Sequence, residues 1–132
     1  MSINKVIICG NLTRDPEVRT TASGSTVLNF SVAVNDRAKN PNTGQWEDRP
    51  NYIDCVLFSA PTSGRGDFYA KNLARGVKVC VEGRLRWTQW EAKDGSGKRS
   101  KLDVVADDID LMSRGEAKAE PVDAYYEEPL PF

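Results

Sequence analysis

Two segments of the chain carry aromatic and basic side chains at even spacing, a pattern suited to a polyanion that carries flat rings. Tyr52 and Phe58 are an even number of positions apart, and so are Arg84, Arg86 and Trp90. In an extended strand, residues of one parity point to the same side of the sheet. Aromatic rings stack on nucleobases without reading their sequence, and Arg and Lys bind phosphates. The two sets predict one surface for single-stranded nucleic acid.

Residues of the neighbouring segments extend this predicted surface. The aromatic residue Trp46 could join the stacking residues, and the further basic residues are Arg37, Lys39, Lys93, Lys98 and Arg99. The alternative is that the exposed rings pack against a second subunit or against a hairpin. Aromatic and guanidinium groups occurring together favour stacking on bases over that alternative.

The chain offers little for acid–base or nucleophilic catalysis. It contains no histidine, so the commonest general base and the commonest zinc ligand are absent. Asp107, Asp108 and Asp110 form one dense carboxylate cluster, which a divalent-ion nuclease would need. A solvated strand end also explains that cluster, and no base or nucleophile is paired with it. We therefore expect no enzyme activity, no metal and no cofactor.

The three cysteines, Cys9, Cys55 and Cys80, are odd in number and lack C-x-x-C spacing. Each lies within an apolar run. We interpret them as buried free thiols in a reducing compartment, in preference to metal or redox groups.

The elements that must position these residues are predicted to be strands. Runs of β-branched or alternating apolar residues are typical of strands in a sheet with one buried face. They predict five strands, over residues 5–9, 27–34, 52–58, 77–90 and 98–112, with a short extra strand over 17–20 and a long polar hairpin loop over 35–51.

Alternation also predicts which side chains of these strands face the core. Ile53, Cys55 and Leu57 are expected to face inward, which turns Tyr52 and Phe58 outward. In the fourth strand Trp87 is expected on the core side, where its truncation would cost about 3 to 5 kcal/mol. An irregularity is expected at Asp107 and Asp108.

One short helix is predicted between the third and fourth strands. Asp67 is a plausible N-cap, Tyr69 and Leu73 lie one turn apart, and Gly76 follows as the C′ residue. Three strands, a helix and two strands match an all-β protein with one short helix, the five-stranded OB-fold Greek-key barrel. A β-sandwich would need more strands and no such helix.

Charge divides the chain into a basic body and an acidic tail. Residues 1–114 carry 17 Lys plus Arg against 14 Asp plus Glu, while residues 115–132 carry one lysine against five acids. The tail is rich in proline and has no periodic apolar pattern, so we expect it to be disordered. The predicted domains are therefore 1–114 and 115–132.

The end of the tail combines carboxylates with apolar side chains, as a peptide that docks in a basic-rimmed apolar pocket requires. These predicted partner-docking residues are Glu127, Glu128, Leu130, Pro131 and Phe132. The alternative is a tail that only promotes solubility. No apolar run has the length of a membrane helix or of a signal-peptide core, so we expect a cytosolic protein without membrane contact.

Several of these segments together resemble the bacterial and phage-type single-stranded DNA-binding proteins, the SSB family. The resemblance covers about residues 3–112 and the C-terminal tip. It is carried by residues 4–12 (NKVIICGNL), 15–19 (DPEVR), 56–58 (VLF), 76–79 (GVKV), 81–86 (VEGRLR), Trp90 and the terminal Pro131-Phe132.

The resemblance implies an OB fold, homotetramer assembly with a dimer as the alternative, and cooperative coating of single-stranded DNA. It also implies a tail that recruits replication, recombination and repair proteins. Tyr52 stands where the family usually has a stacking Trp, Phe58 where it has a Phe, and Trp90 where it has a Trp. Such a protein would work at the nucleoid, or in the host cytoplasm if phage-encoded.

The chain departs from the family pattern in three places. A further stacking Trp expected among residues 36–39 is absent, and Trp46 is a candidate replacement. The usual long linker is reduced to a few residues after Arg114, and Pro129 separates the acids from the apolar tip. Bacterial, plasmid and phage origins all stay open. An interaction module of the same fold that binds proteins first and DNA weakly is the remaining alternative.

Overall fold

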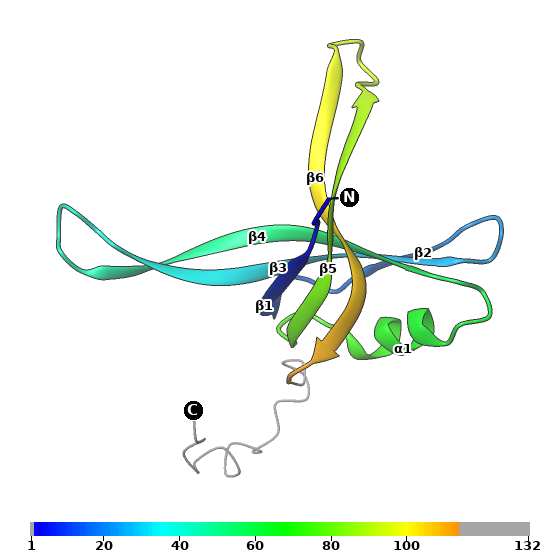
Figure 1. Cartoon of the computed structure of the whole chain (residues 1–132), viewed down its shortest axis with the longest axis horizontal. Helices are drawn as coiled ribbons and strands as arrows, with labels where there is room; N and C mark the ends of the chain where they lie inside the picture. Colours follow the sequence, from blue (N-terminus) through cyan, green and yellow to red (C-terminus); the bar gives the residue numbers. More distant parts are fainter. Residues whose placement is uncertain (1, 114–132) are drawn as a thin grey trace.

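A computed structural model describes residues 2–113, which form six strands and one helix (Figure 1). The predicted docking tip, residues 127–132, lies outside the described residues. The elements are β1 (Val6–Leu12), β2 (Glu17–Thr20), β3 (Thr26–Lys39), β4 (Trp46–Ser59), α1 (Arg65–Asn72), β5 (Lys78–Glu91) and β6 (Lys98–Leu111).

Five of the strands close into a barrel. The sheet order is β1-β5-β6-β4-β3-β2, and a further antiparallel pairing of β1 with β3 closes the ring. Strand β2 pairs only with β3, while β4 and β6 form the one parallel pair among the described strands. With α1 between β4 and β5, this is the OB-fold predicted from the sequence.

The inward rows of the strands form the core. Leu28, Phe30 and Val32 of β3 are fully buried beside Leu57 of β4 and Val81 of β5, as the alternation predicts. Helix α1 closes one end of the barrel, with Tyr69 of the helix and its C-cap residue Leu73 buried. The Tyr69 hydroxyl donates to the Ile109 carbonyl oxygen at 2.9 Å, which ties the helix to β6.

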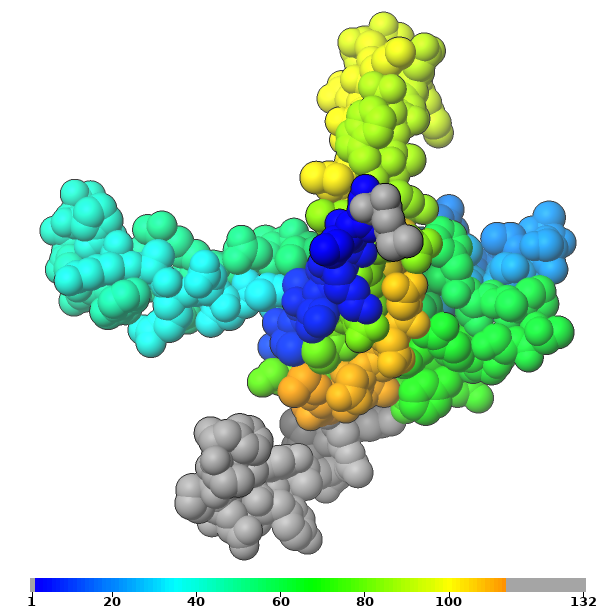
Figure 2. Space-filling view, in the orientation of Figure 1, coloured from blue at the N-terminus to red at the C-terminus, as the bar shows by residue number. Residues whose placement is uncertain are grey.

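Two long hairpins extend away from the barrel in different directions (Figures 1 and 2). The predicted loop over residues 35–51 is wrong in its extent, because β3 and β4 stay paired from Thr26 with Ser59 out to Lys39 with Trp46. Only residues 40–45 connect them. A two-stranded ribbon satisfies its backbone groups by itself, so it can form from polar residues that carry no strand-like apolar pattern.

The helix begins earlier than predicted. Gly64 occupies the N-cap position without a side-chain cap, and Asp67 lies in the first turn, where a carboxylate complements the helix dipole. The predicted irregularity in β6 is confirmed. Glu82 pairs with Asp108 and Gly83 with Ala106, which leaves Asp107 as the extra residue of a bulge.

The prediction that all three cysteines are buried is confirmed only for Cys55. Cys9 is exposed and Cys80 half-buried, because both lie on the outer side of β1 and β5. The pKa of the Cys55 thiol is raised to about 12, first by burial and then by the carboxylates of Asp54 and Asp103. This thiol is therefore unreactive at neutral pH.

The core position predicted for Trp87 is wrong, since its side chain is 60% exposed. Strand β5 leaves the barrel beyond Gly83, so its inward row no longer meets an opposite wall. Leu85 and Leu102 on the same side of the hairpin are exposed as well. Truncating Trp87 therefore removes little buried area within one chain.

Among residues 2–113, α1 is the one helix, and its eight residues fall well short of a membrane crossing.

The β6 bulge brings Gly83 so close to the next strand that no side chain fits there. A Cβ at Gly83 would lie 2.1 Å from the Val105 carbonyl oxygen, which is backbone and cannot move aside. We expect Gly83→Ala to lower the free energy of unfolding by about 1 to 3 kcal/mol or more. Denaturant titration measures this loss.

Gly64→Ala is the matched control, because nothing lies within 4 Å of its Cβ position. Equal stabilities of the two variants would contradict the close approach at the bulge.

Candidate nucleic-acid interface

The register of β3 and β4 places the predicted residues of this hairpin on its outward side. Leu57 pairs with Leu28 and faces the core, so the alternate pairs face outward. These outward pairs are Phe58 with Val27, Tyr52 with Ala33, Arg37 with Asp48 and Lys39 with Trp46. The side chains of Tyr52, Phe58 and Trp46 are 69%, 49% and 60% exposed.

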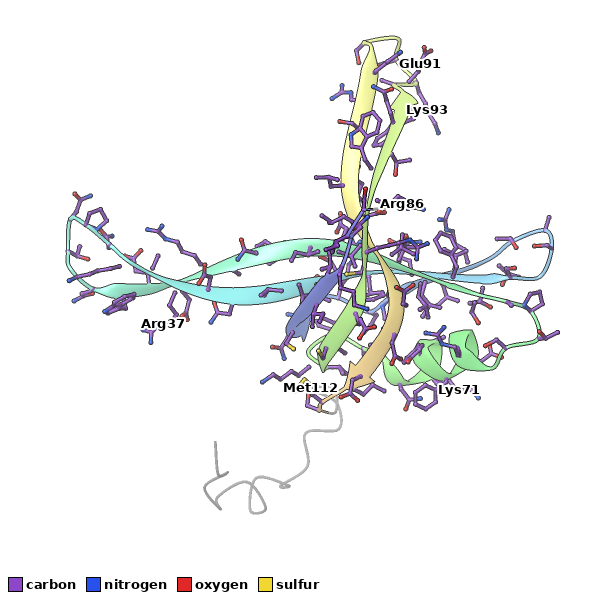
Figure 3. The ribbon with its side chains drawn as sticks, viewed as in Figure 1. Arg37, Lys71, Arg86, Glu91, Lys93 and Met112 are labelled. Atoms are coloured by element: carbon purple, nitrogen blue, oxygen red, sulfur yellow. The ribbon has the colours of Figure 1, made fainter. Side chains whose placement is uncertain are left out.

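Strand β5 contributes the second set, on the outward side of the other hairpin. Arg86 pairs with Asp103 and Trp90 with Arg99, so these four share one side. Trp90 is 47% exposed. Figure 3 shows Arg86 where the hairpin leaves the barrel and Lys93 near its tip, while Arg37 lies on the other hairpin.

The two sets meet at the parallel contact between β4 and β6. Val56 lies beside Val105 on the outward side, and with Val27 they form a small buried apolar cluster. The Arg86 guanidinium carbon lies 5.6 Å from the centroid of the Phe58 ring, within cation–π range. Phe58 of the first segment and Arg86 of the second therefore come together, while Tyr52 and Trp90 lie further out along the two hairpins.

A carboxylate fixes the guanidinium above that ring. Asp103 accepts hydrogen bonds from Arg86 at both oxygens, Nε to Oδ1 at 3.1 Å and Nη2 to Oδ2 at 2.8 Å. Asp103 is only 8% exposed. A bidentate pair of this kind holds both the position and the plane of the guanidinium. Arg86 is therefore oriented within the protein before any ligand arrives.

Other cations of this surface also have carboxylate partners. Lys101 Nζ lies 3.0 Å from Asp54 Oδ2, and Arg84 Nη1 lies 3.0 Å from Asp107 Oδ1. The Arg37–Asp48 contact is longer, at 3.6 Å. By contrast, Lys39, Lys93, Lys98 and Arg99 make no ion pair within residues 2–113.

One predicted residue lies on the other side. Lys98 pairs with Glu91 and so shares the side of Trp87 and Leu102, because neighbouring residues of a strand face opposite ways. Lys98 and Arg99 therefore cannot belong to one surface. Lys93 lies in the turn between β5 and β6.

Sequence reasoning missed Lys101 and the Arg86–Asp103 pair. Lys101 has the parity of Arg99 and lies on the same side, so counting along the strand could have found it. The Asp103 contact has no comparable signal, since it depends on the bulge that sets the register of β6 against β5.

Two of the three carboxylates considered for the nuclease alternative, Asp107 and Asp108, are engaged in other contacts. Asp107 binds Arg84 with its side chain, and its carbonyl oxygen accepts from Arg65 Nη2. Asp108 Oδ1 accepts from the Tyr69 hydroxyl and from the Ile109 amide. Within residues 2–113, no three His, Cys, Asp or Glu side chains gather as a metal site would require.

Comparison with known sequences identifies the family. The model of the single-strand binding protein family matches residues 3–112. The single-stranded DNA-binding protein of Borreliella burgdorferi is 38% identical over 86% of this chain and 72% of its own length. That of Treponema pallidum is 36% identical over 89% of this chain and 64% of its length. The chain thus matches about two thirds of the length of these relatives.

Solved structures show the same fold. A Plasmodium falciparum SSB complex with single-stranded DNA superposes with a TM-score of 0.73 at 21% identity, covering 86% of this chain and 97% of that one. A single-stranded DNA-binding protein from Thermus aquaticus gives 0.69 at 30% identity, covering 84% and 51% of the two chains.

The buried Asp103 carboxylate should contribute more to stability than the exposed carboxylates of the same surface. We expect Asp103→Asn to lower the free energy of unfolding by about 1 to 3 kcal/mol, because Arg86 keeps its charge and loses a charged acceptor. Asp54→Asn is the control, since that ion pair is about half-exposed and should cost about 1 kcal/mol at most. Equal losses in thermal or denaturant unfolding would contradict the special role of Asp103.

Proposed function

This chain belongs to the single-strand binding protein family, and we propose that it coats single-stranded DNA without sequence preference and carries no enzyme activity. In this proposal, residues 1–114 bind DNA and self-associate, and residues 115–132 dock partner proteins. The observation that carries it is the Phe58 ring, half-exposed beneath an oriented Arg86 on the side that also presents Tyr52 and Trp90.

Stacking on exposed rings explains why such a surface would prefer a single strand. Phe58, Tyr52 and Trp90 are each about half-exposed or more, so each offers a ring face to a base. Bases in a duplex are already stacked and paired, and they cannot reach these rings. We propose that Trp46, opposite Lys39 on the outer part of the first hairpin, supplies the stacking position that the family has near residues 36–39.

Phosphate contacts fall into two groups with different energetics. Within residues 2–113, Lys39, Lys93 and Arg99 have no carboxylate partner, so no carboxylate of that part of the chain competes there with a phosphate. Arg84 and Arg37 must share their charge with Asp107 and Asp48. Arg86 acts mainly by holding the Phe58 ring and adds a positive field there. Lys98 would contact a phosphate only if the DNA strand wraps around the edge of the β5–β6 hairpin.

Self-association is supported by an apolar patch on the opposite side of the β5–β6 hairpin. Leu85, Trp87 and Leu102 are exposed together, at 46%, 60% and 62%. A contiguous apolar patch of this kind marks a protein contact more often than a solvated surface. We propose a homotetramer, with a dimer as the alternative.

The tail completes the proposal. Glu127 and Glu128 with Leu130, Pro131 and Phe132 would dock in apolar pockets rimmed by Arg or Lys on replication, recombination and repair proteins. The body carries excess positive charge and the tail excess negative charge, so the two would serve DNA and partners separately. A protein with these roles works in the cytoplasm at the nucleoid, or in a phage-infected host.

Removing the exposed rings should weaken single-strand binding while the domain stays folded. We expect Phe58→Ala and Trp90→Ala each to cost about 1 to 3 kcal/mol of binding to labelled oligo(dT), the typical contribution of one stacked base. Fluorescence anisotropy measures the affinity, with a duplex of equal length as a second ligand and the sedimentation mass recorded for each variant.

Phe68→Ala is the matched control, because Phe68 on α1 is 52% exposed but lies outside this surface. Its affinity should equal that of wild type. Equal affinity in wild type and a Phe58→Ala, Trp90→Ala double variant would refute stacking and favour the module that binds proteins first. Similar affinities for duplex and single strand would contradict the mechanism as well.

Deleting residues 127–132 should separate the two activities. We expect DNA affinity to be unchanged or slightly raised, because the deletion removes negative charge that competes for the basic body. Partner binding should be lost, since Phe132 offers an apolar ring beside its own terminal carboxylate and a pocket can bind both. Pull-downs with wild type and the deletion variant measure this.

A second variant with one residue added after Phe132 moves the carboxylate away from the ring. It should damage docking nearly as much as the deletion does. If both variants recover the same proteins as wild type, the tail only promotes solubility.

A further inference from the structure

Two cysteines lie opposite each other on the outer side of β1 and β5. Cys9 pairs with Cys80 in antiparallel register, one position from the pair Ile8 with Val81. Val81 is fully buried and Ile8 packs against the core, so the adjacent cysteine side chains both point outward. Cys9 is exposed and Cys80 is half-buried, and neither forms a disulfide.

Direct pairing places the two Cα atoms within the range that a disulfide spans. Directly paired residues in antiparallel strands have Cα atoms about 4.5 to 5.5 Å apart, and disulfides span about 4.4 to 6.8 Å. The third cysteine, Cys55, is buried on β4 and cannot take part. A disulfide here would therefore have one possible pairing within the chain.

The groups around Cys80 favour its protonated form. The pKa of the Cys80 thiol is raised, first by a side-chain hydrogen bond with Cys9, then by partial burial and by the neighbouring charges of Asp110 and Glu82. Cys80 thus tends to hold its proton, and Cys9 is the thiol that a reagent in solution reaches first. The order of attack follows from this difference in exposure.

We propose that Cys9 and Cys80 form a modification site at which a low-molecular-weight disulfide closes an intrachain disulfide. The Cys9 thiolate attacks one sulfur of the small disulfide, whose S–S bond breaks and releases one small thiol after protonation. The Cys80 thiolate then attacks Cys9 Sγ in the mixed disulfide, which forms the Cys9–Cys80 bond and releases the second small thiol. The chain loses two protons and two electrons, and the small disulfide gains both as it becomes two thiols.

The bond would fix β1 in the barrel. Among the described strands, β1 pairs along most of its length with β5 and with β3 at Asn11 and Leu12. A covalent link also closes the chain between residues 9 and 80 into a loop, which reduces the entropy of the unfolded state. The site shares no residue with the proposed DNA surface, so it does not depend on DNA binding.

The test uses the full chain, folded and freed of reductant, with oxidised glutathione as the probe. Free thiols are then alkylated, and the protein is digested without reduction for mass spectrometry. We expect a chain lighter by two hydrogens, a cross-linked peptide joining Cys9 and Cys80, and a Cys55 that is alkylated only after denaturation. Thermal unfolding should shift upward by about 5 °C or more, and dithiothreitol should reverse the shift.

Three variants separate this reaction from others. Cys9→Ser and Cys80→Ser should form no intrachain bond, and any product should be a mixed disulfide with glutathione. Cys55→Ala should close its disulfide as wild type does. A Cys9–Cys9 bond between chains, a stable mixed disulfide in wild type, or no reaction would each overturn the proposal.

Discussion

Each barrel strand has to bury one row of side chains, and the period of two leaves the other row free for a different task. Val79 and Val81 of β5 are fully buried, while the alternate residues of the same strand include Cys80, Arg84 and Arg86. Closing five strands into a ring fixes which row is inward. The side on which each candidate binding residue of the strands lies depends on that one choice.

The same constraint explains why much of the fold was predictable from the sequence. The alternation of Leu28, Phe30 and Val32 predicts the inward row of β3. The spacing of Tyr69 and Leu73 predicts the helix that closes the barrel. Prediction failed where the chain leaves the barrel. Trp87 is in the inward-facing row of β5, but among the described strands none lies opposite to cover its side chain. The ribbon over residues 35–51 is paired through its backbone, and it has no row of apolar residues from which a strand could be predicted.

The side on which the aromatic rings of the candidate site lie was predictable from the sequence, but the ion pairs of its charged residues were less so. The outward positions of Phe58 and Trp90 follow from alternation along their own strands. That alternation is the same whichever residues of the neighbouring strand lie opposite. Whether Arg86 is free or paired depends on which residue of β6 lies opposite, and the bulge at Asp107 sets that register. No pattern within β5 contains that information, so the Asp103 contact became visible only in three dimensions.

The carboxylates on a surface proposed for a polyanion have a physical reason. An unpaired guanidinium beside Phe58 would be free to rotate, and ordering it on binding would cost side-chain entropy at the moment of contact. Asp103 removes that cost by fixing Arg86 in the folded protein, at the expense of part of its charge. Lys39 and Lys93 lie on the outer parts of the two hairpins and have no such partner among residues 2–113, so a long lysine side chain there can follow a DNA strand whose path varies. The proposed surface would thus combine a central Arg86 fixed by Asp103 with long, flexible cationic side chains at its ends, an arrangement that suits binding without sequence preference.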